Sequence, residues 1–99
     1  MSKDQVIALI YHVIDTFNAH YADQYHLEKS EDTVLFGIGG VLDSLGLVNF
    51  ILAVEEKIEE TEGRPMVLAD ARAVSQKNSP FRTVKTLAEY VHGLLEKET

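Results

Sequence analysis

The sequence contains no cysteine, so disulfide bridges, a thiol nucleophile and thiolate metal sites are all excluded. Basic residues are scarce: 9 Lys and Arg stand against 16 Asp and Glu, which gives a net charge of −7. This imbalance argues against nucleic acid and anionic membrane surfaces as partners, because both are bound through clustered positive charge. Neither a signal peptide nor an apolar run long enough for a membrane span is recognisable. We therefore expect a cytoplasmic protein whose 99 residues form a single domain.

Apolar side chains recur at intervals of three and four residues in three stretches, which is the spacing of one face of an α-helix. The pattern predicts long helices over about 3–21, from 43–44 to about 60, and from Thr83 onward, and a short helix is predicted over 70–75. No stretch of useful length alternates as a strand does. The predicted fold is all-α, a small antiparallel bundle of three long helices and one short helix. The predicted N-cap residues of the long helices are Ser2, Asp43 and Thr83.

The second predicted helix has two apolar faces. At about 100° per residue, one stripe forms the predicted core face, made of Leu47, Phe50, Ile51, Val54 and Ile58. On nearly the opposite side lie Leu45, Val48 and Leu52, continued by Glu55, Glu56 and Glu59. A small bundle buries one face of each helix, so the second face predicts an exposed docking surface. The alternative is that the apolar segment 34–42 folds over this face and buries it.

The start of this helix is the second candidate feature. Ser44 lies at or just after the N-cap, where free N–H groups and the helix dipole favour a phosphate group. The alternative is that Asp43 and Ser44 only cap the helix. The preceding Gly37-Ile38-Gly39-Gly40 predicts a loop with unusual dihedrals or a close backbone approach. The acidic excess is also local, because residues 31–62 contain eight acidic side chains and one lysine.

The motif Leu42-Asp43-Ser44-Leu45-Gly46, at the start of an acidic second helix, resembles the acyl carrier protein family. The resemblance covers most of the chain, from the amphipathic first helix to the ending Phe81-Arg82-Thr83-Val84. It implies that Ser44 carries 4′-phosphopantetheine, attached by a phosphopantetheinyl transferase. The thiol of that arm would hold an acyl or aminoacyl group as a thioester, which accommodates the absence of cysteine.

The same resemblance implies a monomeric carrier that is not itself an enzyme. Asp43 matches the family aspartate that is linked to recognition by the transferase. A loading ligase and downstream acyltransferases or synthases are the implied partners. Their implied contacts are Leu45, Val48 and Leu52, with Glu55, Glu56 and Glu59 as charged contacts.

The cargo is left open by one departure from the family pattern. Val41 stands where many fatty-acid carriers have glycine, and the local sequence looks closer to D-alanyl carriers and other specialised stand-alone carriers. Fatty acyl, polyketide, aminoacyl and D-alanyl cargo therefore all remain candidates. Segments 22–36 and 64–79 are longer than a minimal carrier needs, and no role is predicted for them.

Two other functions compete with the carrier hypothesis. The first is an unmodified helical interaction module that binds a basic partner through the same face of the second helix. The second is a small hydrolase that uses Ser44, but the sequence has no Gly-x-Ser-x-Gly motif and no recognisable triad. The histidines are too scattered to predict a metal site.

Overall fold

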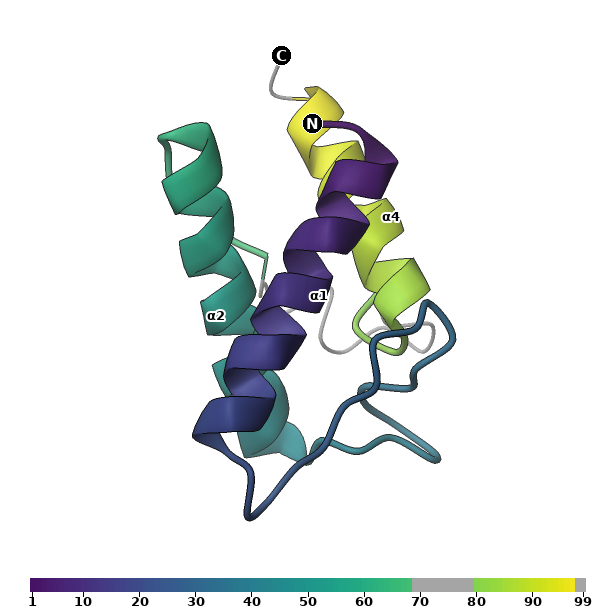
Figure 1. Cartoon of the computed structure of the whole chain (residues 1–99). Coiled ribbons are helices and arrows are strands. Elements are labelled where there is room, and N and C mark those ends of the chain that lie inside the picture. The colour runs from purple at the N-terminus through teal and green to yellow at the C-terminus, as the bar shows by residue number, and fades with distance from the viewer. Residues whose placement is uncertain (69–79, 98–99) are drawn as a thin grey trace.

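The described part of the protein contains three helices and connecting segments. The structure is a computed structural model that describes residues 1–68 and 80–97. Its helices are α1 (Lys3–His20), α2 (Ser44–Glu62) and α4 (Val84–Lys97). In Figure 1, α1 lies between α2 and α4, and both of these run antiparallel to it. The connection from α1 to α2 crosses the end of the molecule opposite the start of α1 and the end of α4.

The all-helical prediction is confirmed for these residues, but the predicted helix count is wrong. We expected three long helices and a short fourth one, whereas the described part of the chain forms three helices. The stretch 70–75, where the short helix was expected, lies outside the described residues. Val74 is the only large apolar residue of that stretch, so it lacked the repeated apolar face that identified the other helices.

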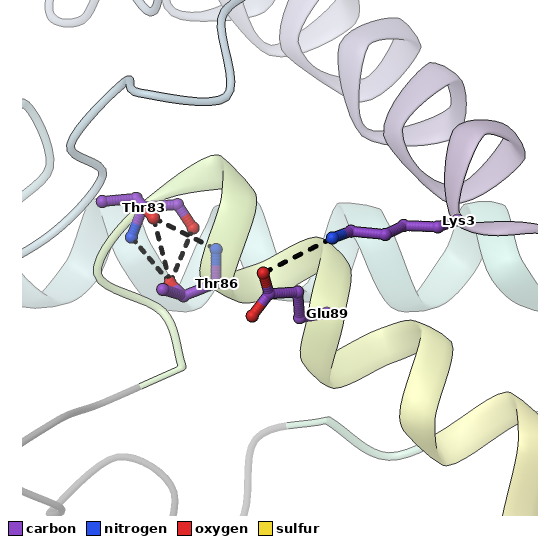
Figure 2. Close-up of polar contacts among 4 residues, drawn as sticks. All are labelled: Lys3, Thr83, Thr86 and Glu89. Carbon is purple, nitrogen blue, oxygen red and sulfur yellow. Dashed lines mark hydrogen bonds and ion pairs between the residues drawn. The ribbon is translucent and has the colours of Figure 1, made fainter.

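Side chains cap the helices where the sequence predicts. Ser2 and Gln5 form a capping box on α1, with N···O distances of 3.2 and 2.7 Å. At α4 a threonine takes the part usually played by Glu or Gln (Figure 2). The Thr86 N–H donates to Thr83 Oγ1 at 3.1 Å, and the Thr83 N–H donates to Thr86 Oγ1 at 3.0 Å. Figure 2 also shows the ion pair that joins α1 to α4, Lys3 Nζ to Glu89 Oε1 at 3.4 Å.

The connections complete the hydrophobic core. α1 packs against both α2 and α4, while the described backbones of α2 and α4 do not approach each other closely. Buried side chains from outside the helices also belong to the core, namely Leu27, Leu35, Leu42, Met66, Leu68 and Phe81. Within the apolar segment 34–42, Leu35 is fully buried. The loop before α2 is thus anchored by its own side chains.

Backbone hydrogen bonds also fix this loop. The Leu35 N–H donates to the Arg82 carbonyl at 2.6 Å, and the Val84 N–H donates to the Thr33 carbonyl at 3.1 Å. The chain then turns back, and the Leu42 N–H donates to the Leu35 carbonyl at 2.9 Å. The segment that leads into α2 is therefore braced against the start of α4.

Glycine is required at the tip of this loop. Gly37 and Gly39 have φ values of 98° and 80°, which side chains other than glycine rarely adopt. Gly40 is needed for a different reason: a Cβ there would lie 2.7 Å from the Cα of Phe36. Both reasons given by the sequence, unusual dihedrals and close approach, are confirmed. Ile38, between Gly37 and Gly39, lies at the tip of the turn with 96% of its surface exposed.

Candidate functional site

Asp43 and Ser44 divide two tasks at the start of α2. The Asp43 side chain performs the capping, since its Oδ1 accepts from the Gly46 N–H at 2.7 Å. Ser44 is the first residue of the helix and is exposed. In the described residues its hydroxyl makes no hydrogen bond. Capping thus accounts for Asp43 and leaves the Ser44 hydroxyl available for chemistry.

A tyrosine from the preceding connection contacts the cap. The Tyr25 hydroxyl donates to the same Asp43 oxygen, Oδ1, at 2.9 Å. The hydrogen bond from the Gly46 N–H, followed by that from Tyr25, lowers the pKa of the Asp43 carboxyl below its ordinary value. The bond to this carboxylate in turn raises the pKa of Tyr25. Asp43 is therefore ionised at neutral pH, and Tyr25 keeps its proton.

The Tyr25 ring packs against both α1 and α2. It stacks on Phe17 of α1 at a centroid distance of 5.7 Å, and Phe17 in turn meets Phe50 of α2 edge-on at 5.4 Å. Gly46 of α2 is also close, since a Cβ there would lie 2.9 Å from the Tyr25 Cζ and hydroxyl oxygen. Sequence reasoning missed Tyr25, because it lies in a stretch without periodicity. The glycine at position 46 was the only local sign that something packs closely there.

The second apolar face of α2 is open to solvent. Leu45 is 69% exposed, Val48 50% and Leu52 51%. We call these three residues the outer face. Segment 34–42 does not bury them, because Leu35 and Leu42 turn into the core, so that alternative is wrong.

The three glutamates beside the outer face differ in their surroundings. Glu56 and Glu59 are exposed. Glu55 is half-buried, and its Oε2 accepts from the Leu68 N–H at 2.6 Å. Glu55 thus ties the chain after α2 back onto the helix, a structural contact that the sequence did not predict. Glu56 and Glu59 are the carboxylates best placed to meet a partner.

A shallow groove of about 230 Å³ runs between α1 and α2 at the edge of the outer face. Leu52 belongs to both features and the exposed Glu56 also lines the groove, so the groove extends the exposed surface toward α1. Its lining residues are Thr16, Phe17, His20, Tyr21, Asn49, Leu52, Ala53 and Glu56.

In the described ranges, no three His, Asp or Glu side chains gather to hold a metal ion. The helices of this part of the chain are too short or too polar to cross a membrane.

We compared the chain with models of known protein families, with curated proteins and with solved structures, and none of the three comparisons gave a match. Function therefore has to be inferred from the residues and their geometry. Those residues are Ser44 at the start of α2, the Asp43 cap that Tyr25 contacts, and the exposed outer face beside acidic side chains.

Proposed function

We propose that the protein is an acyl carrier protein that bears 4′-phosphopantetheine on Ser44. The observation that carries the proposal is the division of tasks at the start of α2. Asp43 caps the helix, while the adjacent Ser44 hydroxyl is exposed and, within the described residues, unbonded. A serine that served only for capping would bond to the first turn with its own hydroxyl.

The surroundings of Ser44 fit a phosphate ester. The positive end of the α2 dipole favours negative charge there, and the exposed hydroxyl leaves a bulky arm free to extend into solvent. Once bound, the arm supplies a thiol that carries acyl or aminoacyl groups as thioesters.

The attachment reaction uses coenzyme A as the donor. The Ser44 oxygen forms a bond to the phosphorus of the phosphopantetheine unit, and the phosphoanhydride bond of coenzyme A breaks. Adenosine 3′,5′-bisphosphate leaves, and the hydroxyl proton passes to a base of the transferase. Asp43 contributes by capping α2, which fixes the backbone that carries Ser44.

The outer face supports the partner contacts of a carrier. Apolar side chains supply affinity, and the exposed Glu56 and Glu59 attract enzymes with basic surfaces. A shuttle must leave each enzyme quickly, and a small patch suits such brief contacts. The proposed partners are the transferase, a loading ligase and downstream acyltransferases or synthases, and the proposed setting is a cytoplasmic monomer.

Mass spectrometry tests the modification directly. The purified chain is incubated with coenzyme A and a transferase of broad specificity, and its intact mass is measured. We expect the gain of one phosphopantetheinyl group in the original chain and in the control Ser30→Ala, and no gain in Ser44→Ala. An unchanged mass of the original chain with several transferases active on other carriers refutes the proposal.

The second candidate is an unmodified interaction module. It is favoured by the outer face itself, which offers an apolar patch whether or not Ser44 is modified. In that case the mass stays unchanged, and a basic partner protein binds Ser44→Ala as tightly as the original chain.

A further inference from the structure

The Asp43 carboxylate has more support than capping requires. A cap needs one bond to an N–H of the first turn, and the Gly46 N–H supplies it at 2.7 Å. The Tyr25 hydroxyl adds a second bond at 2.9 Å, from a residue 18 positions earlier in the chain. Both bonds end on Oδ1, so together they fix the rotation of the Asp43 side chain. The other oxygen, Oδ2, lies outside this pair of bonds.

The second bond also connects Ser44 to the body of the protein. Tyr25 stacks on Phe17, a buried residue of α1, so its hydroxyl is held by the core. Through Asp43 that hydroxyl restrains the backbone immediately before Ser44. The first turn of α2 is thus anchored to α1 through side chains as well as by the packing of the helices.

We propose that Tyr25 is a positioning residue for the modification of Ser44, an inference that rests on the proposed function. By fixing Asp43, Tyr25 holds the backbone that carries Ser44 in one position when the transferase docks. Docking itself uses the outer face, which Tyr25 does not belong to. Loss of the Tyr25 hydroxyl should therefore act on the rate of transfer within the complex and leave the affinity for the transferase unchanged.

The substitution Tyr25→Phe removes the hydroxyl and keeps the ring that packs on Phe17. We expect kcat for phosphopantetheine transfer to fall about threefold to tenfold, the range for loss of one hydrogen bond of ordinary strength, with KM unchanged. Tyr11→Phe is the control. Tyr11 of α1 also packs partly buried against the core, but its hydroxyl has no hydrogen bond in the described residues. Tyr11→Phe should keep the original kcat.

A second variant breaks the same bond without changing either partner. In Gly46→Ala the new Cβ would lie 2.9 Å from the Tyr25 hydroxyl oxygen and 3.2 Å from Asp43 Oδ1, so both atoms of the bond have to shift. Gly46 is buried, and the added methyl group is therefore hidden from the transferase. Gly46→Ala should lower kcat, and adding Tyr25→Phe to it should cause no further loss.

An NMR titration supplies a readout that does not depend on activity. The pKa of Asp43 should rise in Tyr25→Phe and stay unchanged in Tyr11→Phe. The inference is overturned if Tyr25→Phe is modified with the original kcat, or if the two substitutions reduce kcat additively. If the original chain is never modified, the proposed function fails and this inference fails with it. If the original chain is modified and the Tyr25 variants keep its kcat, this inference fails and the proposed function stands.

Discussion

Shortening Leu45 should weaken docking and leave the fold intact. Full burial of a leucine side chain stabilises by about 1.5–3 kcal/mol. Leu45 is 69% exposed, so burying this exposed part in a complex contributes about 1–2 kcal/mol. Alanine keeps the Cβ and therefore part of this contribution. We expect KM for the transferase to rise about threefold to tenfold in Leu45→Ala, with the free energy of unfolding changed by less than about 0.5 kcal/mol.

The assay combines transfer kinetics with unfolding in urea, and two variants serve as controls. Leu45→Met preserves the apolar area and should keep the original KM. Leu47→Ala should show the opposite pattern, because Leu47 is only 4% exposed. Its truncation leaves a cavity and should cost about 2–5 kcal/mol of stability. Val48 and Leu52, each about half exposed, should give smaller KM effects than Leu45.

Two results would refute this reasoning. If Leu45→Ala retains the original KM with the transferase, the outer face is not where that enzyme docks. If Leu45→Ala loses more than about 1 kcal/mol of stability, the side chain contributes to the fold in a way that its exposure does not allow.

Three further predictions follow from charge and backbone geometry. Substituting Lys for both Glu56 and Glu59 should slow phosphopantetheine transfer at low salt, and the difference from the original chain should vanish as added salt screens the charges. Equal transfer rates of the variant and the original chain at low salt contradict a steering role. The lowered pKa of Asp43 means that its ionised form stabilises the fold above the ordinary pKa of 3.8, and that this stabilisation is lost as the pH falls through the lowered value. Urea unfolding of Asp43→Asn should therefore show a weaker acid dependence than the original chain, and an identical acid dependence contradicts the hydrogen-bonded cap. Gly40→Ala should destabilise the fold by about 1–3 kcal/mol, because the new Cβ meets the backbone of Phe36. Gly93→Ala in α4 should stabilise the fold by about 1 kcal/mol, because its Cβ meets open space. Both changes are measured as shifts of the unfolding midpoint in urea.

The helices were predictable because their signals are local. Apolar periodicity and a capping side chain lie within a few residues of each helix end, so Ser2, Asp43 and Thr83 marked the starts correctly. At the other end of α2, Gly63 follows the last residue in the left-handed conformation with φ 77°, where glycine is favoured. The exposed outer face also followed from periodicity, once Leu35 and Leu42 are seen to turn into the core.

Contacts between distant residues were not predictable. The bond from Tyr25 to Asp43 and the bond from Leu68 to Glu55 join positions 18 and 13 residues apart, and no repeating pattern connects them. The predicted count of four helices was wrong for the described residues, which form three, and the stretch 70–75 lies outside them. Local sequence could show that Asp43 caps a helix but could not show what else its carboxylate touches.

The brace between the loop and the start of α4 has a consequence for biosynthesis. A ribosome makes α1, the loop and α2 before it makes residues 82–85, so the loop emerges without the backbone partners that Leu35 and Thr33 use in the finished fold. A nascent or prematurely ended chain thus contains Ser44 but lacks the brace that shapes the approach to α2. If Ser44 is modified as proposed, a transferase that reads the folded start of α2 would pass over chains that end before residues 82–85.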